Sequence, residues 1–404
     1  MSKADSDRTV GIVGAGIAGL VLALGLQRRG ASPMLLEARS EPSLTSEGAF
    51  LTLAPNAMHG LAAIGLSSGV ARSGMETTGI EILDERGARL GMIDQSDHAA
   101  ALGAPSVTVG RGDLMRLLLR ACDAAGIPVL FNTRVERIEP EEHEARLWAA
   151  GRERRYAWIA ACDGLRSSTR AAVFPACPAP RYTGLIGTGG IARIDEIAPT
   201  SGVMRMVFGH TGFFGYQKQG DGPVHWFNSF PAERPEQDLG AMIGVDRLRD
   251  LHRDDPAVVD QILSHVPELL RTYPIYDLPS LSAWSRGRVV LVGDAAHAIG
   301  PHAGQGAAMA IEDAVTLAVC ASGAAGIEAA FHRYEALRRP RVGEVARLTA
   351  RNSAQKRSTT GLDRLLRRLI LPWVLPAGAR AMRRVMSYRV DVDPRLADRF
   401  AAAA

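Results

Sequence analysis

Residues 9–37 read TVGIVGAGIAGLVLALGLQRRGASPMLLE, and this stretch decides the fold of the chain. A short apolar run over residues 9–13 leads into a glycine cluster. An apolar helical pattern then covers residues 17–29 and stops at Gly30, and a second apolar run covers residues 33–36. This order predicts strand, turn, helix and strand, which is a βαβ unit with two parallel strands.

The glycine cluster reads GAGIAG over residues 14–19, and Glu37 ends the second strand. Gly14, Gly16 and Gly19 permit a tight turn and a close backbone approach to a pyrophosphate. The helix that follows offers unpaired N–H groups and a positive dipole end to that anion. Glu37 can accept hydrogen bonds from a ribose diol. The spacing predicts dinucleotide binding; the alternative is a glycine turn between core elements, with Glu37 as an ordinary exposed acid.

Two later segments narrow the class of dinucleotide. Residues 162–170 read CDGLRSSTR after an apolar strand, and residues 293–297 read GDAAH after another. Asp294 follows the end of a predicted strand, where its carboxylate could accept a hydrogen bond from a polyol hydroxyl. Residues 304–306, GQG, bring backbone N–H groups to a helix start, where negative charge is stabilised.

In this order and at these separations, the three motifs resemble those of the single-component FAD-dependent aromatic hydroxylases. These are class A flavoprotein monooxygenases with the p-hydroxybenzoate hydroxylase fold, and the resemblance covers about residues 8–350. It implies an α/β fold with a Rossmann-like FAD-binding domain, an inserted antiparallel β-sheet substrate domain and a C-terminal helical segment.

The resemblance also assigns site residues. The cofactor-binding residues that it implies are Gly14, Ala15, Gly16, Gly19, Glu37, Arg39, Arg111, Val135, Asp163, Asp294, Pro301, Gly304, Gln305 and Gly306. The first glycines would lie under the FAD pyrophosphate, with Glu37 at the adenosine ribose and Val135 at the adenine. Arg111 would lie near the phosphates, and Asp294 at the ribityl chain. Asp163, with Arg170, matches a motif linked to both FAD and NAD(P)H, and residues 304–306 would face the isoalloxazine ring.

The activity that the resemblance implies is hydroxylation of an aromatic or polyketide-like small molecule. Bound FAD would be reduced by NADPH or NADH and would react with O2 to a flavin C4a-hydroperoxide, the oxygen donor. No second Gly-x-Gly-x-x-Gly provides a separate nicotinamide domain. Two alternatives stay open: an epoxidase on the same scaffold, and a non-oxygenating FAD-binding redox or carrier protein.

We expect the domains to interleave along the chain. The FAD-binding domain would comprise residues 1–72, 105–178 and 284–350, the substrate domain residues 73–104 and 179–283, and the C-terminal helical segment residues 351–404. Within residues 181–231, aromatic and β-branched residues alternate as in an antiparallel sheet, and Met206 shares its sequence parity with Tyr216. We expect the substrate between this sheet and the flavin.

Hydroxylation of a phenol benefits from a base that raises the electron density of the ring. His210 and Tyr216 are the candidate catalytic residues, with His225 behind them. The competing interpretation for each is a side chain satisfied within the core or at the surface. His297, in the GDAAH segment, is interpreted as structural.

The charge and cysteine patterns bound the remaining classes. The chain of 404 residues has 47 Lys+Arg against 43 Asp+Glu, and residues 351–404 hold 12 of the former and 4 of the latter, so nucleic-acid binding is not expected. Four scattered cysteines and the absence of a signal peptide fit a cytoplasmic monomer or homodimer. The Leu- and Arg-rich residues 363–388 suggest contact with an anionic membrane, but Pro372 and Pro376 favour a helix packed on the body.

Overall fold

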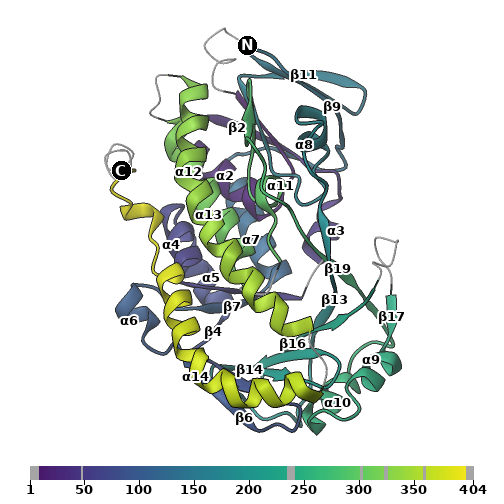
Figure 1. Ribbon diagram of the computed structural model, residues 1–404. Coiled ribbons are helices and arrows are strands. Elements are labelled where there is room, and N and C mark those ends of the chain that lie inside the picture. The colour runs from purple at the N-terminus through teal and green to yellow at the C-terminus, as the bar shows by residue number, and fades with distance from the viewer. Residues whose placement is uncertain are drawn as a thin grey trace.

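Two large sheets organise the computed structural model, which describes residues 9–46, 49–233, 242–300, 304–322, 326–357 and 361–396. A six-stranded sheet occupies the upper half of Figure 1 and a seven-stranded sheet the lower half. The six-stranded sheet is parallel except at the edge strand β20. Its strands, in spatial order, are β20 (Ser285–Arg286), β21 (Val289–Leu291), β12 (Trp158–Ala161), β1 (Thr9–Val13), β2 (Ser32–Leu36) and β8 (Val129–Leu130).

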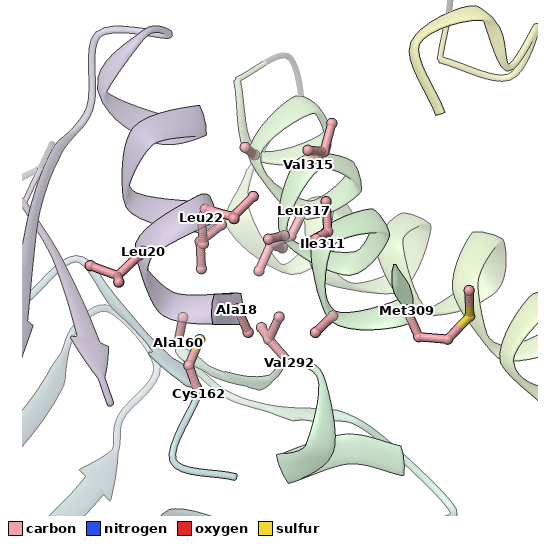
Figure 2. Close-up of a cluster of buried hydrophobic side chains, with 14 of the residues drawn as sticks. Ala18, Leu20, Leu22, Ala160, Cys162, Val292, Met309, Ile311, Val315 and Leu317 are labelled. Atoms are coloured by element: carbon pink, nitrogen blue, oxygen red, sulfur yellow. The ribbon is translucent and has the colours of Figure 1, made fainter. Parts of the chain in front are cut away.

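The βαβ unit is confirmed, and its helix is the centre of the main core. Helix α2 (Ile17–Gln27) is buried from Ala18 to Leu26, because its apolar residues surround the whole helix. Figure 2 shows Leu22 of α2 facing Ile311 and Leu317 of α12 (Gly306–Ala321). Helices α7 (Arg111–Ala124) and α13 (Ile327–Arg357) complete this layer.

The seven-stranded sheet is mixed rather than wholly antiparallel. Strand β14 pairs with β5 in parallel, because β5 comes from a segment before α7 and reaches the sheet by a crossover. In spatial order the strands are β19 (Tyr273–Asp277), β13 (Arg181–Ala192), β16 (Val224–Pro231), β15 (Phe213–Lys218), β14 (Val203–Phe208), β5 (Gly79–Leu83) and β6 (Arg89–Asp94).

The hairpin between β14 and β15 decides which side chains share a face. Its register pairs Met206 with Gly215, and Arg205 with Tyr216. Met206 and Tyr216 therefore lie on opposite faces, although their sequence parity is the same. The face of Tyr216 packs against α9 (Val245–Leu251) and α10 (Ala257–Leu263). The face of Met206 is directed to the opposite side, and we call it the open face.

Smaller elements connect the sheets. The remaining strands are β3 (Phe50–Leu53), β4 (Met75–Glu76), β7 (Val107–Gly110), β9 (Val135–Pro140), β10 (Ala145–Ala149), β11 (Arg152–Tyr156), β17 (Met242–Gly244) and β18 (Leu269–Arg271). The remaining helices are α3 (Glu41–Ser46), α4 (Pro55–Ala63), α5 (Ser67–Ser73), α6 (His98–Leu102), α8 (Ser168–Val173), α11 (Asp294–His297) and the 3-10 turn η2 (Val390–Val392).

The C-terminal segment differs from expectation at its start, because the expected boundary between residues 350 and 351 falls inside α13. The helix that was expected to pack on the body is α14 (Gly361–Met386), which continues through Pro372 and Pro376 with the bend visible in Figure 1. Its inner side chains Leu371 and Leu375 pack on part of the open face. No helix in the described ranges combines the length and apolarity needed to cross a bilayer.

Candidate active site

The glycine turn between β1 and α2 has the geometry that a bound anion requires. Gly14 has a φ of +96°, which favours glycine. A Cβ on Gly19 would lie 2.1 Å from the Gly14 carbonyl oxygen, so Gly19 permits the close packing of helix and turn. A Cβ on Gly16 would meet no atom of the described residues within 4 Å. Gly16 therefore faces open space at the N-terminus of α2.

Glu37 is buried at the end of β2 and is already hydrogen-bonded. Its Oε2 accepts from the Ala15 backbone N–H at 2.8 Å, and its Oε1 accepts from Nε of Arg39 at 2.9 Å. Burial alone would raise the pKa of Glu37, but hydrogen bonds from Arg39 and Ala15 outweigh it and lower the pKa. Glu37 is therefore an ionised acceptor that fixes the glycine turn, and its remaining lone pairs suit a diol.

Arg39 and Val135 lie at the same strand end as Glu37. The Glu37 carbonyl accepts from the Thr133 N–H at 2.8 Å, and the Arg39 carbonyl accepts from the Asn132 N–H at 3.1 Å. Val135 then begins β9 and is half-buried. These contacts gather the residues expected at the adenosine end of the cofactor.

Asp163 and Arg170 connect two loops. Asp163 accepts from Ser167 Oγ at 2.5 Å and from the Thr169 N–H at 3.0 Å, which fixes the start of α8. The buried Arg170 guanidinium donates to the Ala295 carbonyl at 3.0 Å. Arg170 therefore ties the loop after β12 to the loop that carries Asp294.

Asp294 begins α11 and is exposed as a residue, but neighbouring protein still removes water from around its carboxyl. That desolvation raises the pKa of the Asp294 carboxyl, while the charges of His297 and Arg111 act in the opposite direction. Arg111, at the start of α7, thus lies within electrostatic reach of Asp294. A Cβ on the preceding Gly293 would lie 3.3 Å from Cβ of Ala18, so this loop meets the N-terminus of α2. The three segments therefore meet at one place, which we call the cofactor end.

The loop before α12 presents its backbone rather than its side chain. Gln305 is buried, and its Oε1 accepts from Nδ2 of Asn56 at 2.9 Å. A Cβ on Gly304 or Gly306 would meet no atom of the part of the chain that the structure describes within 4 Å, as at Gly16. The side chain of Gln305 is therefore an anchor, and only the backbone of this loop can face a ligand. Pro301 lies outside the described residues.

Sequence reasoning missed a buried ion network that holds these loops. Arg338, on α13, donates to Glu312 Oε2 and to Asp313 Oδ1 at 2.6 Å each, and all three side chains are fully buried. Glu312 also accepts from Asn56 at 2.7 Å, and Asp313 accepts from the Gly293 N–H at 3.0 Å and from His297. A structural role for His297 fits this contact. The available signal was a set of charged residues inside apolar helical patterns.

The structure places His210 away from the cofactor end. His210 lies in the turn of the β14–β15 hairpin, where its backbone N–H and Nδ1 contact Asp255 at 2.8 and 3.1 Å. The opposite end of the hairpin lies near β7, since Gln217 accepts a hydrogen bond from Thr77 at 3.2 Å and Thr77 bonds Thr108 of β7 at 2.7 Å. A six-residue strand is about 20 Å long, so the catalytic expectation for His210 does not fit.

Tyr216 also faces away from the cofactor end. It is buried with the α9 and α10 core, and its hydroxyl accepts from Arg205 Nη1 at 3.3 Å. The expectation for Tyr216 therefore does not fit either, because the hairpin register turns it to the covered face of the sheet.

His225 is on the open face. Its register partners are Ile191 and Gln217, and its ring lies edge-on to Phe50 of β3, with centroids 5.4 Å apart. Burial lowers the pKa of His225, and this is only partly offset by the Pro223 backbone and by Asp113, a neighbour of Arg111. Its Nδ1 is buried and has no hydrogen-bond partner among the described residues.

Aromatic rings surround His225. Phe50 also contacts Phe227, with centroids 5.9 Å apart, and Phe227 contacts Phe213 at 5.7 Å. Phe50 and Phe227 are half-buried. The open face therefore offers half-buried aromatic rings and one neutral imidazole beside the start of α7.

These features fit a flavin dinucleotide. Gly16, Gly304 and Gly306 leave space where a pyrophosphate and a ring system would need the backbone. Glu37 and Asp294 are hydroxyl acceptors at two separate positions, which suits the ribose and the ribityl chain. Within the described part of the chain, no cluster of three or more His, Cys, Asp or Glu side chains could hold a metal ion.

Comparisons with known proteins agree with this geometry. A family profile described as FAD binding domain matches residues 7–349. Aurachin C monooxygenase/isomerase of Stigmatella aurantiaca is 33% identical over 83% of this chain and 86% of its own length. The 2-heptyl-3-hydroxy-4(1H)-quinolone synthase of Pseudomonas aeruginosa is 31% identical over 77% of this chain and 80% of its own length.

Solved structures show the same fold. Klebsiella pneumoniae HpxO, complexed with FAD and uric acid, has a TM-score of 0.83 at 23% identity, covering 94% of this chain and 97% of that one. Both the matched profile and the relatives above 30% identity extend over most of the chain. The chain is therefore an FAD-dependent monooxygenase that belongs to the FAD binding domain family.

Proposed function

We propose that this monooxygenase hydroxylates a neutral, apolar aromatic molecule of the quinolone type, using NAD(P)H and O2. The observation that carries the substrate class is the composition of the open face. Among the described residues, the positions that the strand register places on that face in β13–β16 hold apolar, glycine or uncharged polar side chains and no Arg or Lys. They include Ile191, Met204, Met206, Phe208, Phe213, Gln217, His225, Phe227 and Ser229.

A carboxylated substrate needs a different surface. A buried carboxylate costs several kcal/mol unless a cation or several donors pair with it. The two cations of the central strands lie off the open face. The register turns Arg205 to the face of Tyr216, where it bonds Glu81 at 3.2 Å, and Lys218 donates to the Ile194 and Ile197 carbonyls. The names of two relatives, an aurachin monooxygenase and a heptyl-quinolone synthase, support the same substrate class.

The chain's own residues bind, orient and exclude water. Bound FAD supplies the electron transfer and the oxygen chemistry. We propose that Gly14, Gly16 and Gly19 hold the pyrophosphate, with Glu37 and Arg39 near the adenosine. Backbone N–H groups at Gly304 and Gly306 would stabilise negative charge at the N-terminus of α12.

The remaining assignments place the other candidates around the same cofactor. We propose that Asp294 holds the ribityl hydroxyls, Arg111 lies by the phosphates, Val135 by the adenine, and Ala15, Asp163 and Gln305 hold the loops. His225 would accept the proton of a ring hydroxyl or enol, which raises the electron density of the substrate carbon. No disulfide joins Cys122, Cys162, Cys177 and Cys320 among the described residues, and this supports a cytoplasmic setting.

Substrate-stimulated oxidation of NADPH or NADH tests the proposed function. The purified, FAD-loaded protein is assayed with a 2-alkyl-4(1H)-quinolone, salicylate and 4-hydroxybenzoate, and products are identified by mass spectrometry. We expect a product heavier by one oxygen from the quinolone and none from the benzoates. Turnover of the benzoates alone would contradict the neutral substrate class. An epoxide product, or oxidation of cofactor without any oxygenated product, would support one of the two alternatives instead.

Replacing Gly16 with Ala should weaken FAD binding without unfolding the chain. The new Cβ meets no atom of the described residues within 4 Å, so it occupies the space proposed for the pyrophosphate. Loss of one charge-assisted hydrogen bond of about 1.5–3 kcal/mol weakens binding roughly 10- to 100-fold. Equilibrium titration with FAD measures this, and circular dichroism monitors the fold.

Gly19→Ala is the matched comparison for Gly16→Ala. Its Cβ would collide with the Gly14 carbonyl at 2.1 Å, so this variant should lose both the fold of the turn and thermal stability. Wild-type FAD affinity in Gly16→Ala would contradict the assignment of the pyrophosphate to this turn.

A further inference from the structure

The outer face of α14 is an apolar surface that the fold leaves uncovered. Of the eleven large apolar side chains exposed among the described residues, six lie within residues 365–374. They are Leu365, Leu366, Leu369, Ile370, Trp373 and Val374, and we call them the α14 stripe. Trp373 is 85% exposed and Leu369 is 60% exposed. Their spacings of three, four and seven residues place most of them on one side of the helix.

The opposite side of α14 packs against the protein. Leu371 and Leu375 pack with Phe208 and Phe213, so α14 is anchored on the open face of the sheet. Arg368 contacts Asp84 at 2.8 Å and Arg383 contacts Asp97 at 2.7 Å. The anchoring contacts fix the helix with its stripe pointing outward, so the exposure is a consequence of the fold.

The charge around the stripe selects its occupant. Helix α14 contains six arginines and one aspartate. Arg367 lies over the ring of Phe208 at 4.6 Å on the inner side, whereas Arg380 and Arg384 are exposed further along the helix. A second copy docked through this face would bring the same arginines together, because a two-fold interface contacts itself. An anionic lipid surface instead attracts the arginines and accepts the apolar side chains. Tryptophan is also the side chain that prefers the membrane interface.

We propose that the α14 stripe binds the surface of an anionic membrane. Trp373, Leu369 and their neighbours would enter the headgroup and acyl boundary, while the inner face of α14 stays packed on the substrate side of the sheet. The proposal concerns the helix alone and does not depend on which substrate the enzyme uses. It extends the proposed function, because a neutral apolar substrate would concentrate in the same lipid layer.

Vesicle co-sedimentation tests this proposal. Full-length, FAD-loaded protein is mixed with phosphatidylglycerol-containing vesicles and with pure phosphatidylcholine vesicles. We expect binding to the anionic vesicles that weakens as salt is raised. The double variant Leu369→Gln with Trp373→Gln should lower the partition coefficient at least about tenfold, because each apolar side chain that enters the lipid contributes favourable transfer free energy. The emission of Trp373 should shift to the blue on binding.

Leu269→Gln is the matched control, because Leu269 is 57% exposed on β18. It should bind vesicles as the wild type does, and all variants should keep their FAD content and melting temperature. Absence of binding to either vesicle at low salt would overturn the proposal. So would a concentration-dependent dimer, measured by light scattering, that the double variant abolishes, since the stripe would then bind a second copy.

Discussion

Replacing Arg338 with Met should destabilise the protein by about 3–5 kcal/mol, since it removes the cation that the buried Glu312 and Asp313 share. Arg341 then remains the partner of Glu312 at 3.0 Å, and His297 the partner of Asp313. Burial lowers the pKa of Arg338, but Glu312 and Asp313 outweigh that effect and raise the pKa. The same contacts connect to the Gln305 and Gly293 loops, so FAD affinity should fall as well. Urea unfolding of the apoprotein and FAD titration measure the two effects separately.

Arg253→Met is the matched control for Arg338→Met. Arg253 contacts Asp250 at 2.6 Å, the same separation as between Arg338 and Asp313, but both partners are mostly exposed. An exposed pair of this kind contributes about 0–1 kcal/mol. Equal destabilisation by the two variants would contradict the role of burial.

The acid limit of stability follows from the same network. Burial raises the pKa of Asp313, but His297 and Arg338 outweigh it, so the net shift is downward. A lowered pKa means that the ionised carboxylate stabilises the folded state. This contribution is complete above the ordinary value of 3.8 and is lost as the pH falls through the lowered pKa.

Replacing His225 with Gln should lower kcat/KM roughly 10²- to 10⁴-fold, the usual contribution of a positioned general base. FAD binding should be unchanged, because His225 lies on the open face of the sheet rather than at the glycine turn. The pKa of His225 is lowered below 6.5, so the imidazole is neutral at pH 7. Wild-type activity should fall as the pH drops through that pKa, and the variant should lack this acidic limb.

His210→Gln distinguishes the two histidines. His210 contacts Asp255 in the distal hairpin turn, so this variant should keep most of its activity and its pH profile. A pH profile altered in His210→Gln and preserved in His225→Gln would reverse the assignment. A change in thermal stability alone, with turnover retained in His225→Gln, would assign His225 to packing.

The dinucleotide-binding half of the fold could be predicted because its determinants are local. Gly14, Gly16 and Gly19 fix the turn through backbone conformation, and Glu37 follows at a set distance along the chain. The buried helix α2 could likewise be predicted from its run of apolar residues. Such features depend on a few neighbouring residues and on the standard geometry of a βαβ unit.

The substrate side depends on long-range geometry, and there the sequence misled. Sequence parity grouped Met206 with Tyr216, but residues 209–212 form a turn whose register separates them onto opposite faces. Arg338 meets Asp313 across 25 positions of sequence, which no local pattern encodes. Helix α14 continues through Pro372, and the packing of Leu371 and Leu375 holds this part of the helix on the sheet.

The strand order of the six-stranded sheet also has a consequence for biosynthesis. Strand β12 lies between β1 and β21, so the sheet cannot close until residues 289–291 have left the ribosome. Helix α2 is made early, but α12, which covers its apolar surface, follows only at residues 306–321. During translation the side of α2 that α12 covers therefore stays exposed until most of the chain has been made. Exposed apolar surface of this kind favours aggregation of the nascent chain.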